Sequence, residues 1–146
     1  MEKIYEIQRI KQVRVRVEVE MKTIRTPDDA ARIATQFIGD DDREVFLVMC
    51  LNTKNNVVAV HRAHVGALNS SLVNPREVYK SAILNNSASI IVAHQHPSSE
   101  ISPSREDINV TERLAEAGKI LSIELLDHLI VNDTGEFTSL KEKGYI

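Results

Sequence analysis

The chain has 146 residues, 42% of them apolar and 27% charged, which is typical of a globular domain and unlike a disordered or collagen-like chain. No apolar run approaches the roughly 18 residues of a membrane span, and the N-terminus lacks a signal-peptide pattern. The single Cys50 excludes an internal disulfide framework and a Cys-rich zinc site. We therefore expect one domain over residues 1–146, cytoplasmic and without membrane contact.

The net charge of −3 does not favour nucleic-acid binding, but the charge is unevenly distributed. Residues 1–26 hold seven basic and four acidic residues, so they carry +3 and the remainder carries −6. A basic arm can bind phosphates, yet the solvated face of a strand explains these charges more simply, and the chain has no Trp to stack on bases.

The first elements follow from local patterns. Strict alternation of Val with charged residues over 12–20 predicts a half-buried strand, and we expect residues 1–25 to form an N-terminal strand-like arm. Thr26 and Pro27 then provide a capping hydroxyl and a first-position proline for a helix, which Gly39 is placed to end.

The rest of the chain alternates between short apolar runs and amphipathic segments. Apolar runs of this length are typical of buried strands, and the helices open with an Asn-Pro and a Ser-Pro pair. In chain order we predict strands over 44–51, 57–60, 88–93, 125–131 and 137–140, and helices over 74–86 and 102–118. This interleaving indicates an α/β fold.

Two histidines and an acid carry the chemical signal. His94 and His96 lie two residues apart where the predicted strand 88–93 ends, so their imidazoles can face one point. Ser104 and Asp107 are three residues apart in the opening turns of the next helix and share a face. If that helix start folds back over the strand end, Asp107 joins the two imidazoles.

Two imidazoles and a carboxylate are a usual ligand set for catalytic Zn²⁺, which lowers the pKa of water in its fourth position towards about 7. The same set can hold Fe²⁺. Such a site also needs a base and an oxyanion donor, for which Glu44, directly ahead of a buried strand, and Ser104 are candidates. Taken one at a time, these residues have plainer explanations. The two histidines can be surface residues, and Asp107 can be an acid that favours a helix start. A serine at this helix start can be a cap, and Glu44 an exposed acid beside a strand.

The pattern His94-x-His96-Pro97 followed by Ser104-x-x-Asp107 resembles the JAMM metalloprotease signature, also called MPN+ or JAB. Residues 69–78, 103–108 and 118–128 resemble the bacterial RadC family, once called DNA repair proteins. The resemblance covers residues 23–146, nearly the whole chain.

This resemblance implies a JAMM/MPN-type fold, a cytidine-deaminase-like central β-sheet flanked by helices. It implies one Zn²⁺ per chain on His94, His96 and Asp107, with Glu44 as the acid/base that holds the zinc water and Ser104 steadying the oxyanion. The implied activity is that of a metallopeptidase or isopeptidase acting on a peptide or protein substrate.

Two departures from the family pattern concern specificity and DNA contact. Gln95 stands where RadC proteins commonly have Asn, and Ser98-Ser99-Glu100 replaces Ser-Gly-Asp. Gln95 should point away from the metal, so the altered loop bears on the substrate rather than on the ligand set. Many RadC proteins also carry an N-terminal helix-hairpin-helix domain, for which residues 1–25 leave no room, and this weakens the prediction of direct DNA binding.

Several other residues are candidates for a catalytic, metal-binding or structural role. They are the pair His61 and His64, the thiol of Cys50, Asp127 with His128, and the family-matching Asn69, Ser70, Ser71 and Arg76. We expect the first pair to be surface or hydrogen-bonded histidines and Cys50 to be a buried small hydrophobe. Asp127 and His128 are structural or orient a ligand. The last group can contact substrate, although the segment around Arg76 is equally a plain helix start.

Three hypotheses of different classes follow: a zinc-dependent hydrolase, a non-catalytic scaffold and a DNA-associated binding module. The hydrolase is foremost a peptidase or isopeptidase, and the same metal site is also compatible with another amide or a nucleic-acid-related substrate. A scaffold derived from this family would have lost ligands, whereas the full set is present here. A DNA-binding module predicts salt-dependent affinity for DNA, since phosphate contacts dominate such binding. The sequence is compatible with a homo-oligomer and does not identify the scissile bond.

Overall fold

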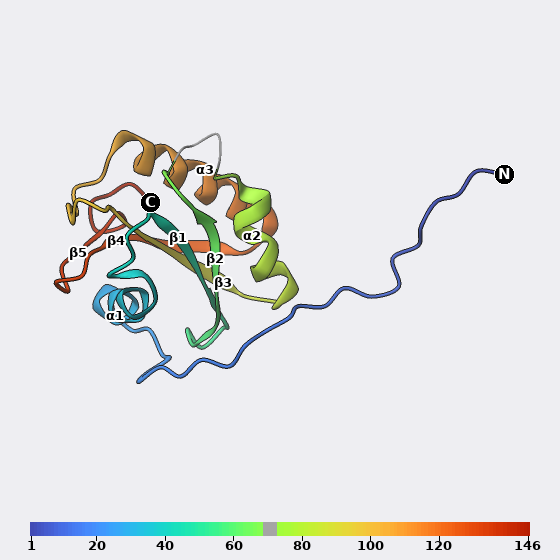
Figure 1. Ribbon diagram of the computed structural model, residues 1–146, viewed down its shortest axis with the longest axis horizontal. Coiled ribbons are helices and arrows are strands. Elements are labelled where there is room, and N and C mark those ends of the chain that lie inside the picture. The colour runs from blue at the N-terminus through green and yellow to red at the C-terminus, as the bar shows by residue number, and fades with distance from the viewer. Residues whose placement is uncertain (69–72) are drawn as a thin grey trace.

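The computed structural model of the chain describes residues 1–68 and 73–146. In that part it has three helices, α1 (Pro27–Ile38), α2 (Pro75–Leu84) and α3 (Arg105–Leu121). The strands are β1 (Val45–Leu51), β2 (Val57–Val65), β3 (Ser89–Gln95), β4 (Glu124–Val131) and β5 (Phe137–Ser139). Figure 1 shows the five strands side by side at the centre of the molecule.

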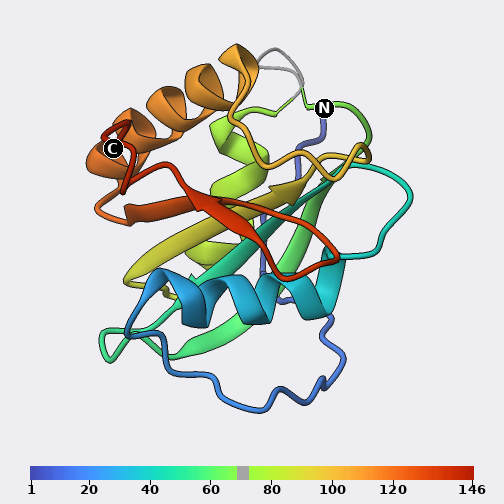
Figure 2. The ribbon, with the colours of Figure 1, turned by 90° about the vertical axis from the view of Figure 1, so that its left-hand side faces the viewer.

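The strands form one mixed sheet in the order β2-β1-β3-β4-β5. The β3–β4 pair is parallel and is connected through α3, while the other neighbouring pairs are antiparallel. α1 covers one face of the sheet, and α2 and α3 cover the other (Figure 2). The expected α/β fold with a central sheet flanked by helices is confirmed.

Two apolar cores fill the spaces between these three layers. Leu47 and Met49 of β1 pack towards α1, whereas Phe46 and Val48 pack towards α2 and α3. Every residue of β1 is therefore buried, which is why this strand is a continuous apolar run rather than an alternating one.

The strand and helix predictions over 26–140 hold, with shifted ends. β2 extends to Val65 and β3 to Gln95, beyond the predicted 57–60 and 88–93. α1 starts after its Thr26 cap and ends at Gly39, as the turn chemistry indicated.

The predicted limits of α3 were wrong at both ends. Its N-cap is Ser104 rather than Ser102, because the Ser104 hydroxyl accepts the Asp107 amide and the Asp107 carboxylate accepts the Ser104 amide. The helix also continues past Gly118 and ends at Ser122, whose φ of 59° is left-handed. Gly118 allows close packing instead: a Cβ there would lie 2.5 Å from both the Ile123 carbonyl oxygen and the Tyr79 hydroxyl.

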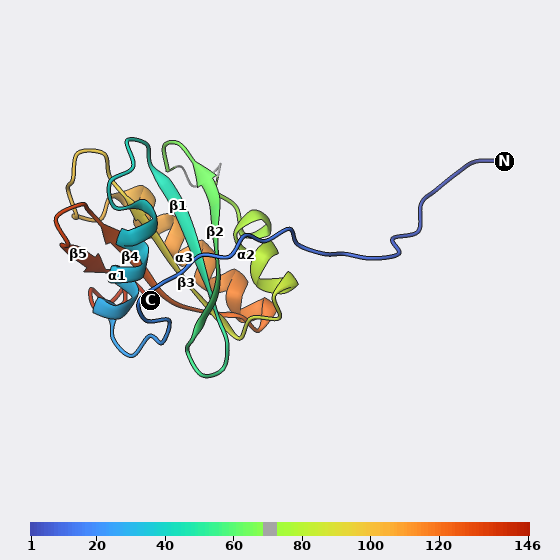
Figure 3. The same cartoon turned by 60° about the horizontal axis from the view of Figure 1, so that its bottom comes forward.

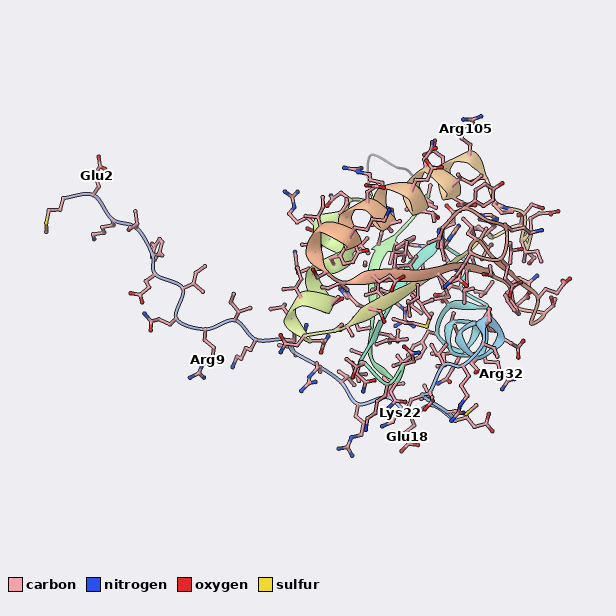
Figure 4. The ribbon with its side chains drawn as sticks, turned by 180° about the vertical axis from the view of Figure 1, so that it is seen from behind. Glu2, Arg9, Glu18, Lys22, Arg32 and Arg105 are labelled. Carbon is pink, nitrogen blue, oxygen red and sulfur yellow. The ribbon has the colours of Figure 1, made fainter. Side chains whose placement is uncertain are left out.

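The half-buried strand predicted over 12–20 is absent from the structure. Val13 and Val15 are 96% and 84% exposed, and residues 12–20 form no strand ladder. An isolated antiparallel bridge joins Thr23, after this segment, to Asn56, just before β2. Alternation alone does not make a strand: residues 11–19 line a groove beside the edge strand β2 without the backbone hydrogen-bond ladder that a strand needs. Residues 1–10 then lead away from the body (Figures 1 and 3), as the positions of Glu2 and Arg9 show in Figure 4.

None of the helices in the described residues has the length and apolar character that crossing a membrane requires.

Replacing Gly118 by Ala should destabilise the protein. Alanine gains about 1 kcal/mol of helix propensity, but its methyl group meets a backbone oxygen that cannot move cheaply, and such overpacking costs about 1–3 kcal/mol. We expect a net loss of up to about 2 kcal/mol in the free energy of unfolding, measured by chemical denaturation. Glu116→Ala on the exposed side of α3 is the control and should change it by less than about 0.5 kcal/mol; equal stability of the two variants would contradict this packing.

Candidate metal centre

The two histidines of the His-x-His pattern lie at the end of β3, on the face covered by α3. His94 continues the row of Ile90 and Val92, which pack in the core between the sheet and α2 and α3. The side-chain period of two along a strand explains why His94 joins this face and Gln95 the opposite one. His94 is 1% exposed and His96 is partly exposed, so the pair reaches from the core to the surface.

The first turn of α3 brings Asp107 against both imidazoles. Asp107 Oδ1 lies 2.9 Å from His94 Nε2, and Oδ2 lies 3.2 Å from His96 Nε2. The two Nε2 atoms are 3.1 Å apart. This cluster lies at the end of α3 that Arg105 marks in Figure 4, and its three side chains have the spacing of ligands to one metal ion.

The electrostatics of the cluster favour an ionised Asp107. Burial alone raises the pKa of this carboxyl, but its contacts with the His94 and His96 imidazoles and the Ser104 amide outweigh burial and hold the pKa well below its usual range. The pKa of His96 is raised, chiefly by its hydrogen bond with Asp107 and more weakly by the charge of Glu44. The site therefore attracts positive charge.

The hydrogen-bond partners of His96 are compatible with a metal ion at its Nε2. His96 Nδ1 lies 2.9 Å from the Glu100 carbonyl oxygen, which can only accept, so this nitrogen carries the hydrogen. In the neutral ring, Nε2 is then a bare acceptor facing the Asp107 carboxylate, another acceptor. Two acceptors at this distance need a positive charge between them, which either a proton on Nε2 or a metal ion bound to neutral imidazoles and a carboxylate supplies.

Glu44 lies beside the cluster, immediately before β1. β1 pairs with β3 so that Phe46 is opposite His94, and Glu44, two residues before Phe46, is close enough for its charge to raise the pKa of His96. Its Oε2 accepts the Leu68 amide at 2.9 Å, and its carbonyl accepts the Gly66 amide at 2.7 Å. The hydrogen bond with Leu68 thus holds the Glu44 carboxylate within electrostatic range of the partly exposed His96.

Ser104 holds Asp107 in position. Its hydroxyl oxygen accepts the Asp107 amide at 3.1 Å, and its own amide donates to Asp107 Oδ2 at 2.7 Å. Because the oxygen acts as an acceptor there, the hydroxyl can still donate its hydrogen to a further group.

The comparisons with known proteins agree with this geometry. The sequence profile of the family described as "RadC-like JAB domain" matches residues 24–145. The chain belongs to the RadC family. The JAMM/MPN-type fold expected from the sequence is thereby confirmed.

Its relatives are similar in sequence but longer. A UPF0758 protein of Geobacillus sp. (strain WCH70) is 52% identical over 123 residues, which are 84% of this chain and 54% of the relative. UPF0758 proteins of Moorella thermoacetica and Shouchella clausii are 53% and 48% identical, over 84% and 89% of this chain and 53% and 58% of theirs. The chain spans about half the length of these curated relatives.

Gln95, where the RadC family commonly has Asn, points away from the cluster as expected. Its Oε1 accepts the Val45 amide at 3.0 Å, and its Nε2 donates to the Arg43 carbonyl at 2.5 Å. These two backbone groups flank Glu44. A buried side chain at the end of β3 therefore holds the segment that carries the candidate base.

Sequence reasoning missed Thr111 and gave His128 no defined contact. His128 Nε2 lies 2.8 Å from His94 Nδ1, and Thr111 Oγ1 lies 2.6 Å from His128 Nδ1. Burial, followed by the charge of His94, lowers the pKa of His128 well below its usual value, so the ring is neutral. The signal available in the sequence was a histidine inside a buried strand, which needs a polar partner.

The remaining candidates lie outside the cluster. His61 and His64 are on the edge strand β2, and Cys50 is buried in β1, where burial raises the pKa of its thiol. Asp127 accepts the Ser139 hydroxyl at 2.6 Å and thereby joins β4 to β5. Arg76 is in the first turn of α2, as expected for a plain helix start. Asn69, Ser70 and Ser71 lie outside the described residues.

Replacing Gln95 by Met should destabilise the protein. The thioether has nearly the same shape but leaves the buried Val45 amide and the Arg43 carbonyl without their partner, which costs about 1–3 kcal/mol in the free energy of unfolding. Gln36→Met is the control, because Gln36 donates to the exposed Glu18 carbonyl and should change stability by less than about 0.5 kcal/mol. Chemical denaturation measures both, and an unaffected Gln95→Met would show that the contact is not needed.

Proposed function

We propose that this RadC protein is a zinc-dependent hydrolase of the JAMM type that cleaves an amide bond in a peptide or protein substrate. The observation that carries the proposal is the convergence of His94, His96 and Asp107 at one point, within electrostatic range of Glu44. When bound there, zinc supplies a Lewis acid that polarises a carbonyl group and makes water more acidic.

Each residue of the cluster has a task in this reaction. His94, His96 and Asp107 hold the metal, as two imidazoles and a carboxylate do in other catalytic zinc sites. Glu44 accepts a proton from the attacking water and returns it to the leaving nitrogen, so that water is added across the amide bond. The Ser104 hydroxyl donates to the carbonyl oxygen as that atom gains negative charge.

The partial exposure of the site supports a macromolecular substrate. His94 and Asp107 are each 1% exposed, so they are shielded from water, whereas His96 and Glu44 reach the surface. A chain segment that runs across this surface can present its amide carbonyl to the site without entering the core.

Metal content tests the ligand set. Wild-type protein should bind about one zinc per chain, and His96→Ala should lose most of it, because structural and catalytic zinc sites depend on each of their few ligands. His61→Ala is the matched control, since it removes an imidazole from the exposed β2 and should keep the metal. Elemental analysis after dialysis measures all three; a wild type that binds no added zinc, or a His96→Ala variant that keeps it, would contradict the ligand assignment.

Turnover tests the assignment of the base. Glu44→Gln should retain zinc but lose activity by a factor of about 100 or more, because the amide cannot accept the proton. The readout is hydrolysis by the zinc-loaded protein of a panel of fluorogenic peptides and isopeptide-linked substrates. Glu112→Gln, an exposed change on α3, is the control. Full activity of Glu44→Gln on a substrate that the wild type cleaves would remove Glu44 from this role.

A further inference from the structure

We propose that Thr111 and His128 are positioning residues that hold His94 in the tautomer whose Nε2 is free to bind metal. The inference rests on the proposed function, because it concerns a ligand of that metal site. It assigns a role to two buried polar side chains, on α3 and β4, that do not touch the metal position themselves.

The three side chains form one chain of hydrogen bonds. Thr111 Oγ1 donates to the Asp107 carbonyl oxygen at 2.7 Å and lies 2.6 Å from His128 Nδ1. On the other side of its ring, His128 Nε2 lies 2.8 Å from His94 Nδ1. The chain therefore begins at the backbone of Asp107 and ends at the imidazole of His94.

The direction of every hydrogen bond follows from its first step. A carbonyl oxygen can only accept, so the single hydrogen of the Thr111 hydroxyl is used on Asp107. The Thr111 oxygen must then accept from His128 Nδ1, which carries the hydrogen of a neutral ring. His128 Nε2 is left as an acceptor, and His94 Nδ1 must donate to it.

In a neutral His94 ring, this order leaves Nε2 without a hydrogen, as metal binding requires. That atom lies 2.9 Å from Asp107 Oδ1 and 3.1 Å from His96 Nε2, at the point where the candidate ligands converge. Loss of the Thr111 hydroxyl would allow His128 to carry its hydrogen on Nε2 and donate to His94. The hydrogen of a neutral His94 would then have to be on Nε2, where it blocks the metal.

Burial of these side chains enforces this order of hydrogen bonds. Thr111 and His128 are 0% exposed, so water is not at hand to satisfy a reversed chain. Phe46 covers both rings, with centroid distances of 6.2 Å to His94 and 5.6 Å to His128.

The two histidine ligands are held by different means. His96 has its tautomer set by the backbone carbonyl of Glu100, which no substitution removes. His94 depends on two side chains, 17 and 34 residues away from their partners in sequence. Thr111 is therefore a position at which a single hydroxyl controls the metal site.

Histidine NMR on the metal-free full chain tests the hydrogen-bond order. Long-range ¹H–¹⁵N spectra of the imidazoles, recorded near pH 8.5 where free imidazoles are neutral, should show wild-type His128 with its hydrogen on Nδ1. Thr111→Val keeps the shape of the side chain and should move that hydrogen to Nε2, whereas Thr111→Ser should restore the wild-type pattern. Thr35→Val, on α1 across the sheet, controls for loss of a helix threonine.

Zinc affinity, measured by competition with a chromophoric chelator, tests the consequence. It should fall roughly 10–100-fold in Thr111→Val, the range typical for loss of a group that orients a metal-binding histidine, and remain near the wild-type value in Thr111→Ser. The proposal is overturned by a hydrogen on Nε2 of wild-type His128, by an unchanged tautomer in Thr111→Val, or by a changed tautomer with unchanged affinity. Failure of the wild type to bind zinc would instead refute the metal site itself, whatever the tautomer.

Discussion

Asp107 ties the first turn of α3 to the end of β3, and the arrangement of the site depends on this contact. Its backbone amide and carboxylate complete the capping box with Ser104, while the same carboxylate faces His94 and His96. Its carbonyl oxygen anchors the hydrogen bonds that run through Thr111 and His128. One residue thus starts a helix, supplies a candidate ligand and supports the hydrogen bonds behind another ligand. A shift of α3 along the sheet would disturb all three roles at once.

Local chemistry made much of this architecture predictable. Caps such as Thr26 act within one turn of their helix, and the apolar run of β1 reflects burial on both faces, so both can be read without knowledge of distant residues. The His-x-His spacing at the end of a strand places two imidazoles on one side by the same local geometry. The convergence of Asp107 on them required only that the helix begin close to the strand end. The fold class and the three candidate ligands therefore followed from short-range patterns.

The features that sequence reasoning missed depend on contacts between distant segments. The alternation over 12–20 has the period of a strand, but a strand also needs a hydrogen-bonded neighbour, and this segment lies beside β2 without forming a ladder with it. Glycine is common at helix ends, yet Gly118 lies inside α3, where the absence of a side chain allows close packing against Tyr79 and Ile123. Gln95 acts on backbone groups 50 and 52 residues earlier in the chain. Nothing in the sequence around Thr111 signals that its hydroxyl meets His128.

X-ray absorption at the zinc edge of the zinc-loaded wild type tests the central claim most directly, because it reports the ligands themselves rather than activity. The structure predicts two imidazole rings and light oxygen donors at about 2.0–2.1 Å, in four-coordinate geometry. A sulfur scatterer near about 2.3 Å would indicate binding through Cys50. That result, or a shell without two imidazoles, would contradict a metal centre built from His94, His96 and Asp107.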